Sequence, residues 1–313
     1  MTTRHPSLSD LCSPDREPAA RAERKLCFLK RAGLFGKNTL GATINRACTA
    51  DQLRQAYRLV HDVFQESGYL KPEPSGLRLR MFETSSETAT FIAEKAGVVV
   101  GVLSVVGDSP DVGLPSDAAF KSELDARRTQ GRRLCEITNQ AVAPAYRKSA
   151  VPTELMRCAL AHELETGYDD SVATVSPSHH GFYALLGFDP LGNERSYSTK
   201  LYDPVIALLM GLDQFRSQPE GLRGTARFLH HYATRGNKFL SRVRGWGRRA
   251  RRNFLNADLL EALFVRERNF LGECSAAELQ ILQHRWGQEM FEAVTGGMDM
   301  PARAGREPAR RSR

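Results

Sequence analysis

Apolar residues recur along this chain with two periods, one typical of helices and one typical of strands. A capped helix is predicted to begin at Thr49, which is followed three residues later by Gln52, and to end at Gly68. Its apolar face consists of residues at helical spacing: Leu53, Tyr57, Val60 and Phe64. This segment is therefore predicted to be an amphipathic helix.

Strand patterns follow this helix. Residues 88–108 form two runs rich in Val, Ile and Phe around a turn at 95–97, which predicts an antiparallel hairpin. Residues 134–144 predict a further strand. Its apolar run is interrupted by three polar residues, which a purely structural strand rarely carries together: Glu136, Thr138 and Asn139.

Helical and strand patterns then alternate. A helix is predicted from Pro152 to Gly167, a strand at 171–175 and a short helix at about 180–186. This order predicts an α+β domain with a mixed central sheet. We expect four regions: a disordered arm (1–40), the α+β domain (41–212), a basic helical extension (213–300) and a disordered tail (301–313).

Composition excludes several classes of protein. The chain has no apolar run long enough to span a membrane and no signal-peptide core, so we expect a cytoplasmic location. The six cysteines are scattered without metal-ligand spacing, which favours reduced thiols and no metal site. The net charge of +8 belongs to residues 216–252, which hold eleven Lys or Arg residues and one acid.

In the order of its elements and in several segments, the chain resembles the FeeM-like N-acyl amino acid synthases, relatives of the acyl-homoserine lactone synthases in the GNAT superfamily. The resemblance covers about residues 50–212. The segments that carry it are AYRLVHDVFQESGYL (56–70), VGVLSVVGDSPDVGLPSD (100–117), ELDARRTQGRRLCEITNQAV (123–142), AYR (145–147) and VSPSHHGFYALLGF (175–188).

The resemblance implies a GNAT-like fold whose central strands separate to admit an acyl-bearing phosphopantetheine arm. It also implies an acyl-acyl carrier protein donor, an amino acid acceptor and no metal or redox cofactor. Residues 147–152 contain no glycine, whereas a typical acetyltransferase has a Gly-rich pyrophosphate loop there. This departure favours a carrier protein, with one phosphate diester, over coenzyme A. Asn139 replaces the arginine of the lactone synthases' E-x-x-R pattern, which weakens a lactone-synthase interpretation.

Amide formation requires a group that receives the amine proton and a donor that stabilises the oxyanion. Glu136 is our candidate base, because burial would raise its proton affinity; the alternative is an ion pair with Arg132 or Arg133. Asn139 is a candidate substrate ligand, or it satisfies backbone groups at a bulge. Strict alternation would separate Glu136 from Asn139, and a bulge between them would bring both to one face.

Five further residues are candidates, each with a structural alternative. Arg147, just past the strand, would hold the pantetheine phosphate, or it is a solvated arginine. Tyr183 would protonate the leaving thiolate, or it packs in the core. His179 and Phe182 follow the family pattern P-x-H-x-x-F-Y and would contact substrate, although a histidine often has only a structural role. Arg132 would bind the acceptor carboxylate, a role for which its neighbouring arginines also compete.

The chain beyond residue 212 lies outside the resemblance. Residues 235–255 combine an apolar helical face with many arginines, so they would meet a carrier protein, a membrane surface or nucleic acid, or form a solvated linker. We favour the carrier protein or the inner membrane. Two further amphipathic helices, expected at 256–270 and from Ser275, would form a small cap or a dimer contact.

The leading hypothesis is N-acylation of an amino acid by a long-chain acyl-acyl carrier protein. A conventional acyl-CoA-dependent N-acyltransferase is the nearest alternative. A second alternative is a catalytically silent GNAT-like module that binds membrane or nucleic acid through its basic tail.

Overall fold

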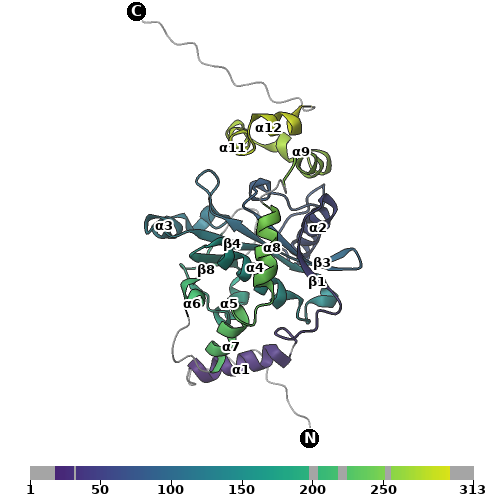
Figure 1. The fold of residues 1–313 in the computed structure, drawn as a ribbon. Helices are drawn as coiled ribbons and strands as arrows, with labels where there is room; N and C mark the ends of the chain where they lie inside the picture. The colour runs from purple at the N-terminus through teal and green to yellow at the C-terminus, as the bar shows by residue number, and fades with distance from the viewer. Residues whose placement is uncertain (1–17, 32, 197–203, 218–223, 251–254, 297–313) are drawn as a thin grey trace, which may run out of the picture.

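A mixed sheet runs through the centre of the molecule (Figure 1). The computed structural model describes residues 18–31, 33–196, 204–217, 224–250 and 255–296. Strand order in the sheet is β1-β2-β3-β4-β5-β8-β6, with β7 paired to β8, and β4 and β5 run parallel. The strands are β1 (Thr43–Arg46), β2 (Ala89–Lys95), β3 (Val98–Gly107), β4 (Leu134–Val142), β5 (Asp170–Val175), β6 (Asp189–Pro190), β7 (Arg195–Ser196) and β8 (Pro204–Gly211). The sheet confirms the predicted α+β class.

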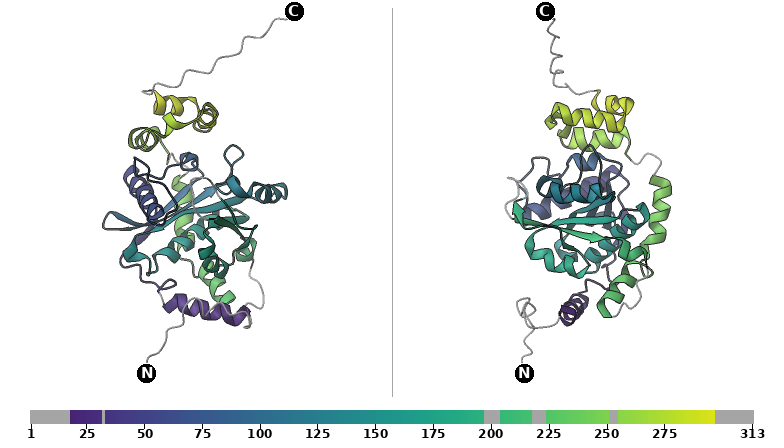
Figure 2. Two further views of the ribbon diagram at one scale, coloured as in Figure 1. Left: turned by 180° about the vertical axis from the view of Figure 1, so that it is seen from behind. Right: turned by 90° about the vertical axis from the view of Figure 1, so that its left-hand side faces the viewer.

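Helices cover both faces of the sheet, with α2 on one face and α4 on the other (Figure 2). The α-helices are α1 (Pro18–Arg31), α2 (Ala50–Glu66), α3 (Asp117–Thr129), α4 (Val151–Thr166), α5 (His180–Leu185), α6 (Asp213–Arg216), α7 (Gly224–Ala233), α8 (Phe239–Ala250), α9 (Ala257–Glu261), α10 (Phe270–Glu273), α11 (Ala276–Trp286) and α12 (Gln288–Thr295). Short 3-10 turns lie at Met81–Thr84, Pro144–Tyr146 and Pro177–His179, and a π-helix lies at Ala262–Glu267.

The two strongest patterns in the sequence form the elements that they predicted. The hydroxyl of Thr49 accepts a hydrogen bond from the backbone N–H of Gln52 at 3.1 Å and caps α2. The side chain of Gln52 accepts from the N–H of Cys48, one residue before the position that a reciprocal capping box would use. Strands β2 and β3 form the predicted hairpin, and Ala96 and Gly97 both take positive φ in its tight turn.

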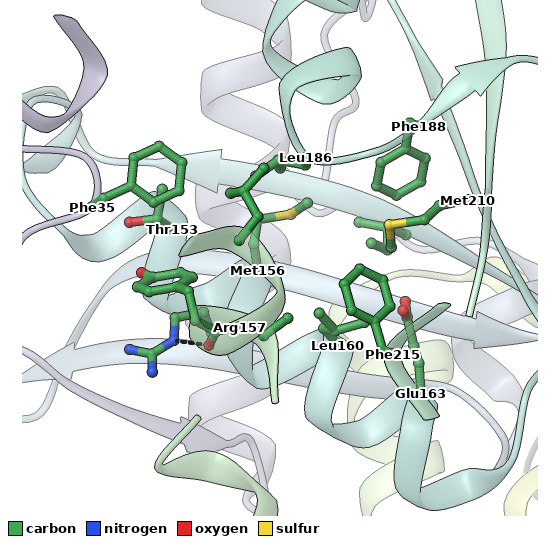
Figure 3. Close-up of a pocket in the computed structure, with 14 residues that line it drawn as sticks. Phe35, Thr153, Met156, Arg157, Leu160, Glu163, Leu186, Phe188, Met210 and Phe215 are labelled. Carbon is green, nitrogen blue, oxygen red and sulfur yellow. Dashed lines mark hydrogen bonds between the residues drawn. The ribbon is translucent and has the colours of Figure 1, made fainter. Parts of the chain in front are cut away.

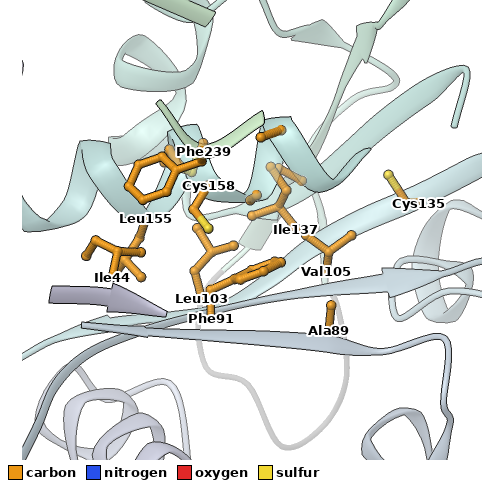
Figure 4. Packing of buried hydrophobic residues seen from close by; sticks show 14 of the residues in the cluster. Ile44, Ala89, Phe91, Leu103, Val105, Cys135, Ile137, Leu155, Cys158 and Phe239 are labelled. Carbon is orange, nitrogen blue, oxygen red and sulfur yellow. The ribbon is translucent and has the colours of Figure 1, made fainter. Parts of the chain in front are cut away.

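The main hydrophobic core lies between the sheet and α4 (Figure 4). Phe91 and Leu103 project from the sheet, and Leu155 and Cys158 project from α4 to meet them. All four side chains are fully buried. Burial raises the pKa of the Cys158 thiol, so this cysteine acts as a small apolar residue.

The structure contains elements that the sequence patterns missed. Helix α3 lies in the segment that was interpreted as a polar connection, and β8 is an inner strand between β5 and β6. Helix α1 and a packed segment at 33–42 replace much of the predicted disordered arm. Helix α1 packs against α7, where the ammonium group of Lys30 lies 3.8 Å from the centroid of the Phe228 ring. Residues 1–17 and the predicted tail at 301–313 lie outside the described residues.

The C-terminal extension divides between the two faces of the sheet. Helices α7 and α8 pack on α4, while α9 to α12 join the core on the α2 face, above the sheet in Figure 1. Phe239 and Val243 of α8 are buried, and Trp246 stacks on Phe91 with ring centroids 6.2 Å apart. The apolar side of residues 235–255 was predicted to meet a carrier protein or a membrane. At these three residues that prediction is corrected, because their side chains complete the core of the protein. Among the described residues, no helix is long and apolar enough to cross a membrane.

Candidate active site

The central strands β4 and β5 separate partway along their length. They pair from Leu134 opposite Asp170 to Ile137 opposite Ala173, and the pairing ends there. Beyond this point β4 continues beside β3, and β5 continues beside β8. Their carboxyl ends therefore form a fork in the sheet, as the sequence resemblance implied.

A β-bulge lies on β4 at the start of this fork. Thr138 pairs with Ser104 and Ala141 pairs with Val102, so three steps along β4 match two steps along β3. Asn139 within the bulge has a φ of 54°, a conformation that asparagine tolerates better than most residues. The extra residue reverses the alternation of side chains, so Glu136 and Asn139 share the α2 face of the sheet. Interruption of the ladder also makes the backbone N–H groups there candidate oxyanion donors.

Glu136 is a buried carboxyl on this shared face. Its side chain is 1% exposed, and Oε2 accepts a hydrogen bond from the backbone N–H of Ser116 at 2.8 Å. Burial raises the pKa of Glu136 to about 7, although the Ser116 hydrogen bonds and the charge of Arg80 oppose this shift. A carboxyl with this pKa exchanges protons near neutral pH.

The ion-pair alternative for Glu136 does not match the observed contacts. Arg132 pairs with Asp170 and Asp213, and Arg133 donates to backbone carbonyl oxygens at 166 and 167. Arg132 also lies before β4 begins, at the end of the strand away from the fork. The structure therefore does not bring Arg132 to the other candidate residues.

A polar network beside Asn139 was missed by the sequence analysis. The Asn139 amide donates to Glu83 at 2.9 Å, and its carbonyl oxygen accepts from Nε of Arg78 at 3.3 Å. Arg80 forms an ion pair with Glu83 at 2.6 Å. The sequence feature that could have indicated this network is the alternation of leucine and arginine in LRLR (77–80). Its two leucines are buried, and its two arginines lie on the opposite side of this segment. Its spatial partners lie more than fifty residues away in the sequence, which local patterns do not reveal.

Tyr183 connects α5 to β4 on the opposite, α4 face of the sheet. Its hydroxyl donates a hydrogen bond of 2.7 Å to Oε1 of Gln140, the residue that follows Asn139 in the chain. The ring is buried edge-to-face against Phe182 and Phe188, and burial raises the pKa of the phenol. Tyr183 thus lies beside the bulge on the face opposite Glu136.

The remaining candidates lie at the margins of the fork. Nε of Arg147 donates to the Val142 carbonyl oxygen at 3.1 Å, and the guanidinium pairs with Glu66 at 2.6 Å. His179 is exposed at the end of the turn after β5, and Phe182 is half-buried one helical turn later. No cluster of metal-ligating side chains occurs among the residues that the structure describes.

The N-terminal segment packs against the turn that precedes α4. The N–H of Ala150 donates to the Asn38 carbonyl oxygen at 3.0 Å. A Cβ placed on Gly33 would lie 2.9 Å from the carbonyl oxygen of Lys148. Residues 33–38 therefore pack directly on the turn where the sequence analysis expected a phosphate.

An apolar pocket lies on the α4 face beside the fork (Figure 3). Its cavity volume is about 50 Å³, and the space within it measures about 510 Å³ when the region open to solvent is included. One wall is a stripe along α4. The other walls come from β4, β8, α6, α7, the segment after α5 and the segment after α1. The residues that form these walls are Phe35, Ile137, Thr153, Met156, Arg157, Leu160, Glu163, Leu186, Phe188, Met210, Phe215, Leu229, Tyr232 and Ala233.

The α9–α12 helices hold the loop that carries the polar network. Trp286 of α11 donates its indole N–H to the Thr84 carbonyl oxygen at 3.0 Å. Arg268 donates to the Leu79 carbonyl oxygen at 2.9 Å. Both contacts connect the C-terminal extension to residues 77–84, so this extension supports the α2 face of the site.

Comparison with known proteins adds to this geometry. A family model described as N-acyl amino acid synthase FeeM matches residues 55–213. The solved structure of FeeM, an N-acyl amino acid synthase from uncultured soil microbes, is 26% identical, with a TM-score of 0.52, over 60% of this chain and 97% of that one. A search of curated proteins finds no match.

Two other solved structures are more distant. BjaI, a CoA-dependent acyl-homoserine lactone synthase, is 20% identical, with a TM-score of 0.43, over 62% of this chain and 90% of that one. An acyl-CoA N-acyltransferase from Pseudomonas aeruginosa is 16% identical, with a TM-score of 0.37, over 54% of this chain and 98% of that one.

The mixed sheet with its bulged, forked central strands defines a GNAT-like acyltransferase fold, and the protein is an amide-forming acyltransferase. The family match extends over half of the chain and covers β2 to β8 with the fork between them. The chain belongs to the FeeM family of N-acyl amino acid synthases.

Proposed function

We propose that this protein transfers a long-chain acyl group from an acyl-acyl carrier protein to the amine of an amino acid, with Glu136 as general base. The observation that carries this proposal is the buried Glu136 carboxyl beside the fork and the bulge, with a pKa raised to about 7. It can take a proton from the attacking amine, directly or through a water, at neutral pH.

The proposed reaction uses groups on both faces of the sheet. The amine nitrogen attacks the thioester carbonyl carbon as Glu136 receives its proton, and backbone N–H groups at the bulge stabilise the oxyanion. The tetrahedral intermediate then expels the pantetheine thiolate, forming the amide. Tyr183, on the other face, is proposed to give the thiolate its proton. Glu136 then releases its proton to solvent and Tyr183 takes one up from solvent, so both groups return to their starting states and no net proton is consumed.

The pocket along α4 is the proposed site of the acyl chain. Its walls are predominantly apolar, and it begins beside Ile137, the last paired residue of β4 before the fork. Burial of each methylene group of an acyl chain contributes about 0.8 kcal/mol. A chain bound there would extend away from the thioester on the face opposite Glu136.

The network on the α2 face is the proposed acceptor side. Arg78 and Arg80 bring two guanidinium groups to the face that holds Glu136 and Asn139. An arginine can bind an amino acid carboxylate through two parallel hydrogen bonds. We therefore propose Arg78 or Arg80 for the role that the sequence analysis gave to Arg132.

The turn before α4 supports a carrier protein over coenzyme A as donor. It lacks glycine, residues 33–38 pack against it, and Arg147 is held by Glu66. These features favour a single phosphate diester over a pyrophosphate. Lys37 and Lys148 are exposed there, where an acidic carrier protein would find complementary charge.

The test is mass spectrometry of lipid extracts from cells that express the wild type or Glu136→Gln. Glutamine preserves an acceptor for the Ser116 N–H but cannot act as a base, so acyl amino acids should decrease by about 10²-fold or more. The matched control is Glu87→Gln, which changes an exposed carboxylate. Equal product from the wild type and Glu136→Gln would exclude Glu136 as the base.

Purified protein distinguishes the donors. The wild type is supplied with the same acyl chain as a carrier-protein thioester and as a CoA thioester, together with a mixture of amino acids. Higher kcat/KM with the carrier protein supports the proposal, whereas full activity with CoA alone would establish the conventional acyl-CoA-dependent alternative. Absence of product with both donors would favour a catalytically silent module.

A further inference from the structure

The pocket along α4 has a direction relative to the fork. Since α4 connects the parallel strands β4 and β5, its first turn lies at their forked end and its last turn at their paired end. The stripe from Thr153 to Glu163 covers ten residue-to-residue steps of helix, which corresponds to roughly 15 Å. Figure 3 shows Thr153 and Glu163 at opposite ends of this stripe. Glu163 therefore lies at the end of the pocket farther from the fork.

Glu163 is an unusual residue for this position. Its side chain is fully buried, and Oε1 accepts a hydrogen bond from the Ser171 hydroxyl at 3.0 Å. Among the described residues, none forms a hydrogen bond with Oε2. The neighbouring Cys135 thiol donates to the Asp170 carbonyl oxygen at 3.6 Å, and it is also close enough to the Glu163 carboxyl to oppose part of the rise in its pKa. A buried carboxyl oxygen in an apolar pocket is costly unless a polar group meets it.

We propose that the pocket selects acyl chains that carry a hydroxyl group near their far end, and that Glu163 recognises this hydroxyl. The inference rests on the proposed function, because it assigns the pocket to the acyl chain. Phe188, Met210 and Phe215 surround the same end of the pocket and would contact the last methylene groups.

A hydroxyl group suits this carboxyl in either protonation state. Burial raises the pKa of Glu163 to about 7, so both forms are present near neutral pH. A hydroxyl donates to the carboxylate and accepts from the protonated acid. A plain methyl end would leave Oε2 without a partner, and a site of this kind discriminates against the analogue that lacks the hydroxyl.

The length of the pocket indicates where the hydroxyl would lie. An extended chain advances about 3.5 Å in three bonds, so roughly 15 Å corresponds to a chain on the order of twelve carbons. The matched probes are therefore dodecanoyl and 12-hydroxydodecanoyl chains, each loaded on a carrier protein and on CoA. In one reaction the dodecanoyl and 12-hydroxydodecanoyl thioesters of the carrier protein compete for a mixture of amino acids, and a second reaction does the same with the two CoA thioesters. Mass spectrometry gives the ratio of hydroxylated to plain acyl amide.

The wild type is expected to prefer the hydroxylated chain by about tenfold to hundredfold. Glu163→Leu should abolish this preference, whereas Glu163→Gln, which can still donate and accept, should retain most of it. Met156→Leu, an apolar change in the same pocket, is the control and should leave the ratio unchanged. A wild-type ratio near one, or an unchanged ratio in Glu163→Leu, would overturn the inference.

Binding of the free acids separates this inference from the proposed function. Absence of product with every donor would contradict the proposed function. Calorimetric titration with 12-hydroxydodecanoate and dodecanoate then decides the inference by itself. Tighter binding of the hydroxylated acid by the wild type, lost in Glu163→Leu, supports it. Equal affinities, or no binding of either acid, overturn it.

Discussion

Glu136 and Glu163 are buried carboxyls on opposite faces of the sheet, Glu136 beside the fork and Glu163 at the end of the pocket farther from it. Burial raises the pKa of both Glu136 and Glu163 to about 7, but their surroundings differ. Glu136 accepts a hydrogen bond from the backbone N–H of Ser116 and feels the charge of Arg80, whereas Glu163 lies in an apolar pocket. The same chemical group is therefore suited to proton transfer on one face and to recognition of a ligand on the other.

The pH dependence of the reaction tests the role of Glu136. A base must be ionised, so kcat/KM should rise with pH through about 7 and level off above it. The measurement is kcat/KM from pH 5.5 to 8.5 with a saturating acyl donor. The residual activity of Glu136→Gln should lack this rise. A profile shared by both proteins would assign the ionisation to another group, such as the substrate amine.

Tyr183 gives a second test at the residue scale. Tyr183→Phe removes the hydroxyl that donates to Gln140 and retains the ring packing against Phe182 and Phe188. Because the variant cannot protonate the leaving thiolate, its kcat with alkyl thioesters should fall by about 10²-fold. An aryl thioester, whose thiolate leaves without protonation, should react at nearly the wild-type rate. Equal losses with both donors would indicate that Tyr183 only packs.

At the scale of elements, the bulge in β4 determines which side chains meet. Asn139 must adopt a positive φ for Glu136 and Asn139 to share one face. Glycine adopts this conformation without strain, whereas alanine has a Cβ that opposes it.

Asn139→Gly and Asn139→Ala separate the backbone of the bulge from the amide side chain. Both variants lose the hydrogen bonds to Glu83 and Arg78, but only alanine strains the backbone. The free energy of unfolding should therefore be lower for Asn139→Ala than for Asn139→Gly by about 1 kcal/mol, measured by urea denaturation. Equal stabilities would show that the bulge relaxes to another conformation.

Helices and strands whose apolar residues recur with a clear period were predicted from the sequence, whereas elements with few apolar residues were missed. Helix α2 and the β2–β3 hairpin follow continuous apolar patterns. Helix α3 was missed because it buries only Phe120 and Leu124, a stripe too narrow to produce a clear helical period. The bulge between Glu136 and Asn139 was expected from the family resemblance, in which the central strands separate at this point, and the register of β3 with β4 contains it. The partners Arg78 and Glu83 depend on long-range packing, which the local sequence does not contain.

At the scale of the molecule, the region beyond the family match completes both faces of the site. Helix α7 closes the pocket along α4, and α9 to α12 support the loop with the polar network. The predicted basic extension is therefore two structural units that pack on opposite faces.

Trp286→Phe tests the support of this loop. The variant keeps an aromatic ring beside Phe291 but leaves the Thr84 carbonyl oxygen without the indole donor. We expect the free energy of unfolding to decrease by about 1 kcal/mol and the KM for the amino acid to rise by roughly fivefold, with kcat nearly unchanged. The exposed His284 on the same helix is the control, and His284→Ala should change neither value. A decrease in kcat alone would contradict a positioning role.

The separation of these contacts along the chain has a consequence for synthesis. Trp286 and Thr84 are 202 residues apart. At a translation rate of about 5 to 20 residues per second, the indole is made roughly 10 to 40 seconds after the loop that it holds. A nascent chain would therefore carry the forked sheet before the support on its α2 face exists. The ability to hold an acceptor would be among the last properties that the growing chain acquires.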